Sequence, residues 1–225
     1  MKMINNLIVN LSEKLTVKIN RQNLKNFLAS EATEEEILEI GAKNRPYKDF
    51  FPNVIALDIV AGKEINLIAD AHLLPFKKNS FSTILCTEVL EHCQAPHQVV
   101  NEFYRILKTG GKLILTTSFI FPIHEAPNDY FRFTKYGLKH LCSGFSQVKI
   151  RAETDTVSTM AVLMQRLAFQ CVWVTKIPLV NVLLHLLAKI VPIFSGLIKK
   201  EYGNINRSRV ESEIMSSGYY LVAIK

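Results

Sequence analysis

Two aspartates stand where apolar stretches of the chain end. The run VIALD closes on Asp58, and the next apolar run, INLIAD, closes on Asp70. A carboxylate only accepts hydrogen bonds, and it can take both hydroxyls of a diol at once. Strands that serve only as structure do not need acids at their ends. The two side chains therefore predict a site for a ligand that carries hydroxyl and amino groups.

A second group of reactive side chains lies further along, in the segment PIHEAPNDYFRFT. His124 is of the residue type whose pKa suits a general base near neutral pH. Glu125 and Asp129 are candidates to orient it or to bind a cationic substrate, and Tyr130 and Arg132 are candidates to line a substrate pocket. Alternatively, Asp129 and Arg132 form a structural ion pair and the aromatic side chains belong to the core.

His92, in the segment EVLEH, is the second candidate for a catalytic base, although it could instead bond only to nearby backbone. Glu91 and His92 also resemble metal ligands when they are taken together with Cys93 and His97. The spacing His-Cys-x3-His matches none of the common zinc patterns. From the sequence we therefore expect no metal ion.

The elements that must position these residues alternate along the chain. Short apolar segments are separated by helix-length segments, which predicts an α/β fold with a parallel sheet covered on both faces. Ligands of such sheets bind at the carboxyl ends of the strands, where the two aspartates lie. A helix is predicted over 96–107, begun by Pro96 and ended by Gly110 and Gly111. The predicted strands span 36–40, 54–58, 65–69, 82–87 and 112–118.

The remainder of the chain predicts a helix begun by Thr134, a sixth strand over 145–151 and a last strand in GYYLVAIK. The segment 158–198 is unusually apolar, but Pro178, Pro192 and several polar side chains interrupt it. We therefore expect two or three short amphipathic helices in place of a transmembrane helix. The predicted domains are an N-terminal helical segment at 1–30, a core at 31–157, an apolar helical insertion at 158–216 and the last core strand at 217–225.

Composition narrows the class of protein. The chain has 225 residues, of which 48% are hydrophobic and 21% charged, so it can bury a core and is not disordered. Its four cysteines form no CxxC pair, which is typical of reduced thiols in a cytoplasmic protein. The net charge of +7 suits an anionic membrane surface or an acidic substrate. Because the sequence has no cluster of Lys and Arg interleaved with aromatic residues, we do not expect a nucleic-acid partner.

Four stretches occur in a recognisable order and spacing: ILEIGAKNRPY (37–47), VIALDI (54–59), IADAHLLPFKKNSFSTILCTEVLEH (68–92) and EFYRILKTGGKLILTTSF (102–119). Together they resemble the class I S-adenosylmethionine-dependent methyltransferase family, in its small-molecule, methyltransferase type 11-like branch. The resemblance implies a Rossmann-like, seven-stranded, mostly parallel sheet with helices on both faces and an antiparallel last strand. It also implies S-adenosyl-L-methionine as cofactor, lying across the ends of the first four strands.

The resemblance assigns roles to residues at the ends of the first four predicted strands. Glu39 and Gly41 belong to the glycine-bearing first turn, and Asp58 holds the ribose diol. Asp70 and Ala71 lie beside the adenine, and Thr87 and Glu88 face the methionine end. The neighbouring residues Ala42 and Ile59 are further candidates for contact with the cofactor.

Methyl transfer is an in-line displacement on a sulfonium, so positioning accounts for much of the rate. A base is needed only for a hydroxyl or a protonated amine, and His124 is the first candidate. The loop around it resembles a loop in a subset of the family whose genes often neighbour polysaccharide biosynthesis. We therefore expect a small-molecule, glycan or lipid-linked acceptor.

One position departs from the family pattern, since Lys43 stands where a second glycine is common. A lysine there either crowds the cofactor or points to solvent. Crowding would favour a catalytically silent methyltransferase fold that acts as a binding or scaffold protein. A nicotinamide dehydrogenase is a third hypothesis, but the chain lacks the G-x-G-x-x-G signature in its first turn.

The apolar insertion leaves two interpretations open. In one, it is a lid over the acceptor site or a homodimer interface. In the other, it is a peripheral membrane anchor, helped by Lys199, Lys200 and the basic N-terminal segment, which itself lacks the apolar core of a signal peptide. A lipid-linked glycan or a quinone-type acceptor would explain the second interpretation.

Overall fold

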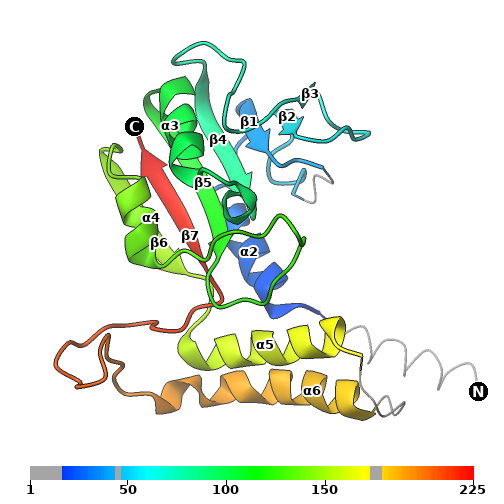
Figure 1. Cartoon of the computed structure of the whole chain (residues 1–225), viewed down its shortest axis with the longest axis vertical. Helices are drawn as coiled ribbons and strands as arrows, with labels where there is room; N and C mark the ends of the chain where they lie inside the picture. The colour runs from blue at the N-terminus through cyan, green and yellow to red at the C-terminus, as the bar shows by residue number, and fades with distance from the viewer. Residues whose placement is uncertain (1–16, 44–46, 173–178) are drawn as a thin grey trace, which may run out of the picture. The chain divides into compact units, whose positions relative to one another are not determined.

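One seven-stranded sheet organises the described part of the chain, which covers residues 17–43, 47–172 and 179–225 of the computed structural model (Figure 1). In chain order, the elements are α2 (Ile19–Ser30), β1 (Ile37–Ile40), β2 (Val54–Asp58), β3 (Leu67–Ile68), β4 (Phe81–Thr87), the 3-10 helix η1 (Leu90–His92), α3 (Pro96–Ile106), β5 (Leu107–Ser118), α4 (Lys135–Leu141), β6 (Gln147–Ala152), α5 (Thr156–Gln170), α6 (Leu179–Ile190), the 3-10 helix η2 (Val191–Leu197) and β7 (Gly218–Ile224).

The strand order in the sheet is β3-β2-β1-β4-β5-β7-β6. Pairs from β3 to β5 are parallel, and β7 runs antiparallel to both of its neighbours. The predicted Rossmann-like sheet is confirmed.

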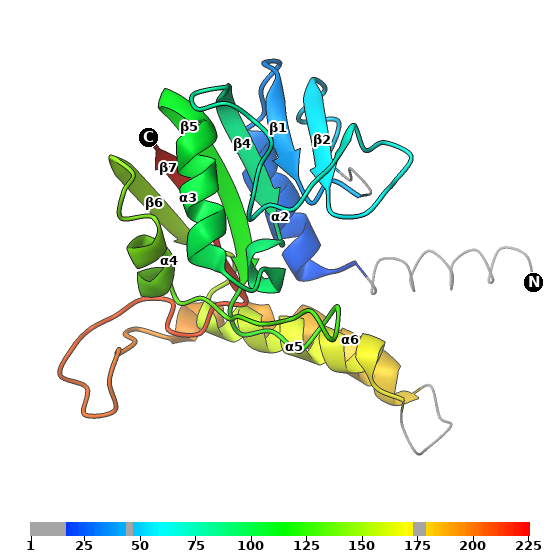
Figure 2. The ribbon, with the colours of Figure 1, turned by 45° about the horizontal axis from the view of Figure 1, so that its top comes forward.

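Both faces of the sheet are buried, because side chains alternate along each strand and helices cover both sides (Figures 1 and 2). On one face, strand residues such as Ile84 and Leu113 form a core with Val99 and Phe103 of α3. On the other face, the ring of Phe27 in α2 stacks on Tyr220 of β7, with centroids 4.6 Å apart. This two-sided cover explains why the strands read as continuous apolar runs.

Helix α3 corrects one prediction. It ends at Ile106, before the glycines, because Leu107 already pairs with Phe81 of β4. Gly110, which was predicted to end the helix, lies inside β5 with φ at 76°. The strand therefore begins five residues earlier than the pattern of apolar side chains suggested (107 against 112).

The chain forms two compact units. One contains the sheet and comprises 25–152 with 218–225; the other comprises 1–24 with 153–217. In the second unit, α5 packs against α6 and η2 (Figure 1), so the expected short helices are present. Asp155 begins α5 as its N-cap, accepting hydrogen bonds from the backbone of Val157 and Ser158. The predictions that fall on 1–16 and on Pro178 lie outside the described residues.

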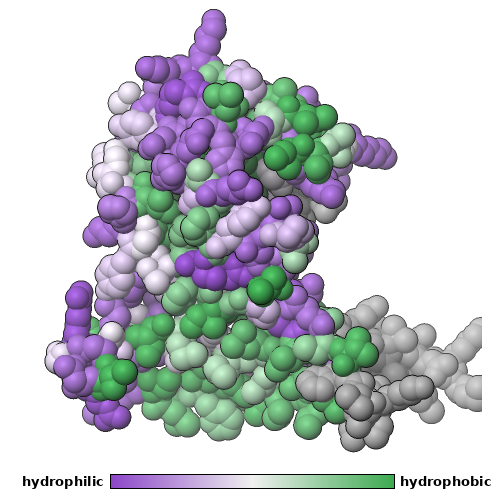
Figure 3. Space-filling model, in the orientation of Figure 1, coloured by the Kyte–Doolittle hydropathy of each residue, from purple (hydrophilic) through white to green (hydrophobic). Residues whose placement is uncertain are grey.

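Apolar side chains gather on the surface of α5, α6 and η2 (Figure 3). Within the described residues, the stretch Val180–Leu197 has the length and apolar composition of a membrane span, and 11% of it is buried. We call the exposed large hydrophobic residues on it the α6 apolar surface. Its members are Val182, Leu183, Leu186, Ile190, Ile193, Phe194 and Leu197.

Candidate active site

A cavity of about 740 Å³ opens at the carboxyl ends of β1, β2 and β4. β1 lies between β2 and β4, at the topological switch point where the strand order reverses. Ligands of open α/β sheets bind at such switch points, and this volume is typical of small-molecule and cofactor sites. The predicted residues that line the cavity are Gly41, Asp58, Ile59, Asp70, Ala71, Glu88, His92, Glu125 and Tyr130.

The Asp58 carboxylate is held in place by backbone. Its Oδ2 accepts a hydrogen bond from the backbone N of Lys43 at 3.0 Å, and its Oδ1 accepts one from Val60 at 3.1 Å. Each oxygen keeps a lone pair for a diol. Lys43 itself is exposed and does not line the cavity. The crowding considered for Lys43 is therefore not observed, and the residue helps to fix Asp58 through its backbone.

Gly41 is required by the geometry of the first turn. Its φ is 73°, in the left-handed region that favours glycine. A Cβ at this position would lie 2.2 Å from Cγ2 of Val89. The residue before that valine, Glu88, also has a positive φ of 55°. The turns after β1 and β4 thus meet in close contact at the floor of the cavity.

The turn after β3 is stabilised by Asp70 and His72. One oxygen of Asp70 accepts from the backbone N and from Nδ1 of His72, at 2.9 and 2.6 Å. The backbone hydrogen bond from His72 is the main cause of the lowered pKa of Asp70. Because Nε2 of His72 accepts from the backbone of Ala95, we assign the ring proton to Nδ1. His72 therefore joins the cavity wall to the start of α3.

A clamp that the sequence did not reveal supports this wall. Arg105 of α3 donates to the carbonyl oxygens of Leu74 and Phe76, and it pairs with Glu102 through two bonds of 2.7 Å. Glu102 in turn accepts from the backbone N of Leu74. The hydrogen bonds from Arg105 are the main cause of the lowered pKa of Glu102. The clamp holds the segment after Ala71 against the helix, so the motif EFYR positions the site without touching the cavity.

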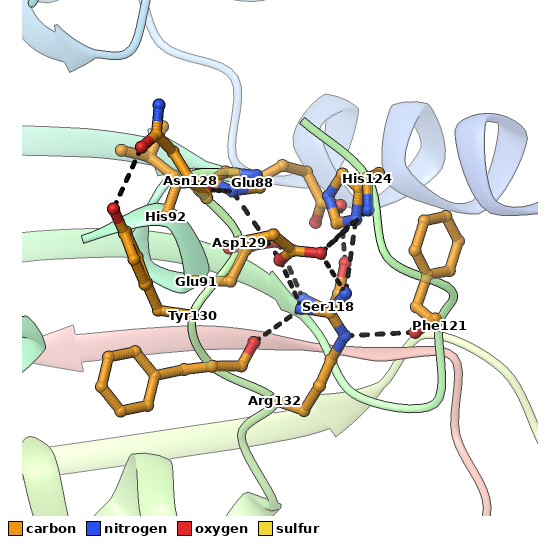
Figure 4. A network of polar contacts seen from close by, with 12 residues as sticks. Glu88, Glu91, His92, Ser118, Phe121, His124, Asn128, Asp129, Tyr130 and Arg132 are labelled. Atoms are coloured by element: carbon orange, nitrogen blue, oxygen red, sulfur yellow. Dashed lines mark hydrogen bonds and ion pairs between the residues drawn. The ribbon is translucent and has the colours of Figure 1, made fainter. Parts of the chain in front are cut away.

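Two carboxylates meet the end of β5 (Figure 4). Glu91 is 0% exposed, and it accepts from the hydroxyl of Thr117 at 2.8 Å and from the backbone N of Ser118 at 3.2 Å. Glu88 accepts from the hydroxyls of Thr116 and Ser118. Burial, followed by the charge of Glu88, raises the pKa of Glu91 to about 8. The EVLEH segment thus places a buried acid beside the cavity.

The loop after β5 is fixed by an ion pair between Arg132 and Asp129 (Figure 4). Two guanidinium nitrogens contact the two carboxylate oxygens, each at 2.6 Å. The hydrogen bonds from Arg132 hold the pKa of Asp129 at about 2. Arg132 also donates to the carbonyls of Phe121, Pro122 and Phe131. Neither side chain lines the cavity, so the geometry supports the structural ion pair and not the predicted acceptor contacts.

The rings of His92 and His124 meet edge to face, with centroids 4.8 Å apart (Figure 4). Nδ1 of His92 lies 2.7 Å from the Asn128 carbonyl, and Nδ1 of His124 lies 3.2 Å from the Pro122 carbonyl. A carbonyl only accepts, so we assign a hydrogen to Nδ1 of His92. Nδ1 of His124 also lies 3.5 Å from a guanidinium nitrogen of Arg132, which only donates, so the Pro122 contact alone does not fix the tautomer of His124. Burial is the main cause of the lowered pKa of His124.

The remaining predicted residues stand back from the cavity. Glu39 and Ala42 are buried, and Thr87 is half-buried at the end of β4. His124 lies behind the cavity-lining His92. His72, which follows the predicted adenine pair in sequence, also lines the cavity. Further lining residues to which no role was assigned from the sequence come from the segment after β4, from α3 and from the loop after β5. They are Val89, Cys93, Gln94, Ala95, Gln98 and Asn128.

Comparison with known proteins agrees with the fold. The family model described as "Methyltransferase domain" matches residues 35–115. The chain is 44% identical over 75 residues to an uncharacterized protein of Methanocaldococcus jannaschii, covering 30% of this chain and 32% of that protein. It is 34% identical over 85 residues to the demethylmenaquinone methyltransferase of Renibacterium salmoninarum, covering 33% of this chain and 36% of that protein. The chain thus matches only about a third of the length of these relatives.

Solved structures share the architecture at low sequence identity. A SAM-dependent methyltransferase of Archaeoglobus fulgidus has a TM-score of 0.55 at 13% identity, with 91% of this chain and 94% of that chain covered. A SAM-dependent methyltransferase of Thermotoga maritima has a TM-score of 0.54 at 17% identity, with 100% of both chains covered. These similarities support the fold alone.

Proposed function

We propose that the protein is an S-adenosylmethionine-dependent methyltransferase, because residues 35–115 match the methyltransferase domain model and lie in a seven-stranded sheet whose β7 is antiparallel to its neighbours. The observation that carries the proposal is the Asp58 carboxylate, fixed by two backbone bonds in the wall of a cavity of cofactor size. In this proposal Asp58 holds the ribose hydroxyls, Asp70 and Ala71 lie beside the adenine, and Gly41 lets the backbone approach the cofactor.

For the acceptor we propose a small molecule with a lipophilic or lipid-linked body and a hydroxyl or carbon nucleophile. Two curated relatives support this class by their names: the demethylmenaquinone methyltransferase above and a ubiquinone/menaquinone C-methyltransferase of a Ruegeria species, 35% identical over 60 residues. The α6 apolar surface supports it physically, since an apolar acceptor resides in a membrane. Glu125 and Tyr130, which line the cavity from the loop after β5, are the candidates for acceptor contact.

Asp58→Asn should weaken binding of S-adenosylmethionine about ten- to hundredfold, because a charge-assisted hydrogen bond contributes about 1.5–3 kcal/mol. An amide keeps the shape of the side chain but offers one acceptor oxygen where the carboxylate offers two. Isothermal titration calorimetry with S-adenosylmethionine and S-adenosylhomocysteine measures the change. Thermal melting of the same samples shows whether the bonds to Lys43 and Val60 survive.

Asp49→Asn is the matched control, because Asp49 is exposed and lies outside the cavity wall. It should bind the cofactor as the wild type does. If the wild-type chain binds neither ligand at millimolar concentration, the proposed function is wrong. If both variants bind equally well, the cofactor site lies elsewhere or Asp58 has no part in it.

A membrane contact through the α6 apolar surface follows from the same proposal. The double variant Ile193→Glu with Leu197→Glu should reduce binding to anionic phospholipid vesicles about tenfold or more, since both side chains are about three-quarters exposed (76% and 77%) and would enter the interface. Lys199 and Lys200 follow in sequence, so binding should also weaken as salt rises.

Leu73→Glu, at an equally exposed apolar side chain in the other unit, is the control for that experiment. Vesicle flotation and size-exclusion chromatography are run on all three proteins. Wild-type protein that stays with the unbound fraction contradicts the membrane contact. A dimer that the double variant converts to a monomer would identify the surface as a homodimer interface.

A further inference from the structure

Three potential metal ligands converge at the end of β5, from two separate segments of the chain. Glu91 and His92 belong to the 3-10 helix η1, and His124 belongs to the loop after β5. One ligand atom from each residue lies within 4.8 Å of the other two. Ligands of a single ion at about 2.0–2.2 Å stand about 3–4.4 Å apart, so side-chain shifts of less than about 1 Å would bring all three into coordination distance.

Each imidazole has a backbone contact of the kind that outer partners of metal-bound histidines provide. Nδ1 lies against a backbone carbonyl in each ring, of Asn128 for His92 and of Pro122 for His124. In the proposed site each Nδ1 donates to that carbonyl and each Nε2 binds the ion. The Glu91 carboxylate is fixed by the hydroxyl of Thr117 and the backbone N of Ser118.

Burial shields this cluster from water. The Glu91 side chain is 0% exposed, and His92 and His124 are half-buried. A divalent ion that displaces the proton of a buried carboxylate supplies the positive partner that such a group needs.

We propose that Glu91, His92 and His124 bind a divalent first-row transition-metal ion such as Zn²⁺, Mn²⁺ or Co²⁺. Two histidines and one carboxylate suit these ions and leave coordination positions open. Because His92 also lines the cavity, an ion bound to it would lie beside the ligand space. The sequence did not suggest this set, since its second histidine lies in a distant loop and not at the His-Cys-x3-His spacing.

A role for the ion in catalysis rests on the proposed methyltransferase function. A hydroxyl of the acceptor would bind the ion and lose its proton to solvent, because a bound cation lowers the pKa of a hydroxyl. An electron pair of that oxygen would then form the bond to the methyl carbon. The sulfonium sulfur would leave as a neutral thioether with the electron pair of the broken C–S bond. This use selects an acceptor with a hydroxyl group.

The test is metal binding by the full chain after chelator treatment. Co²⁺ is titrated while its visible absorption is recorded, and Zn²⁺ binding is followed by calorimetry. We expect one equivalent of either ion in the wild type and in His140→Ala, a matched histidine exposed on α4. His92→Ala and His124→Ala should each lose more than about a hundredfold in affinity, since even outer partners of metal ligands contribute ten- to hundredfold.

Glu91→Gln keeps the hydrogen-bonding shape of the side chain while it removes the charge, so it tests the third ligand with little risk to the fold. It should bind Co²⁺ weakly and melt near the wild-type temperature. No Co²⁺ absorption in the wild type, or equal affinity in the wild type and His124→Ala, would overturn the proposal. Calorimetry with S-adenosylmethionine is run in parallel: metal binding without cofactor binding counts against the methyltransferase function, and cofactor binding without metal binding counts against the ion site.

Discussion

A Gly41→Ala variant should be less stable than the wild type by about 2–5 kcal/mol and should lose cofactor binding. A side chain in the left-handed region costs about 1–2 kcal/mol, and Gly41 has a φ of 73°. Overpacking a filled site costs about 1–3 kcal/mol more, and the new Cβ would lie 2.2 Å from Cγ2 of Val89. Urea denaturation measures the loss of stability, and calorimetry with S-adenosylmethionine measures the loss of binding.

Two control variants separate the cost of the left-handed φ at Gly41 from the cost of the clash with Val89. Gly144→Ala adds the same methyl group where no atom lies within 4 Å, and it should be nearly neutral. The double variant Gly41→Ala with Val89→Ala removes the clash but keeps the unfavourable φ, so its defect should be smaller than the sum of the two single defects. A Gly41→Ala protein with wild-type stability and wild-type affinity would show that the turn tolerates a side chain.

Removal of Arg132 is the second change with a large expected effect. Arg132→Ala leaves the Asp129 side chain, which is 2% exposed, without its charged partner. Breaking a buried pair in this way costs about 3–5 kcal/mol. It also frees the carbonyls of Phe121, Pro122 and Phe131, so the loop after β5 should become accessible to proteases. Urea denaturation and limited proteolysis measure the two effects.

Arg132→Lys keeps the charge but not the planar pair of donors, so its loss of stability should lie between those of the wild type and Arg132→Ala. Arg209→Ala removes an exposed arginine and should change stability by less than about 0.5 kcal/mol. Equal protease resistance in Arg132→Ala and Arg209→Ala would show that the ion pair does not hold the loop.

Much of the fold was predictable because its signals are local. The apolar runs before Asp58 and Asp70 were recognisable, although β3 covers only Leu67–Ile68 of the predicted strand 65–69, and both aspartates line the cavity. Gly110 misled the helix prediction, because pairing of Leu107 with Phe81 ended α3 before any glycine was reached. Helix propensity is a weak guide where a long-range pairing competes with it.

The part of the site that was not predictable depends on groups far apart in the sequence. Glu91 and His124 meet only because β4 and β5 are neighbours in the sheet, and no spacing within either segment records that meeting. The two proposed roles of Asp129 and Arg132 were indistinguishable in the sequence. The distance of 2.6 Å between a guanidinium nitrogen of Arg132 and a carboxylate oxygen of Asp129, and the 2% exposure of the Asp129 side chain, favour the structural ion pair.

The position of β7 has a consequence for the order in which the chain can fold during synthesis. β7 pairs with β5 from Lys112 to Ser118 on one side and with β6 on the other, yet it follows the entire second unit in the chain. Until the ribosome has released residues 218–224, β5 and β6 have no partner on their facing edges. A nascent chain at that stage presents two open strand edges, which other chains can pair with. All residues of the helical unit, up to 217, are therefore synthesised before β7 can join β5 and β6 into one sheet.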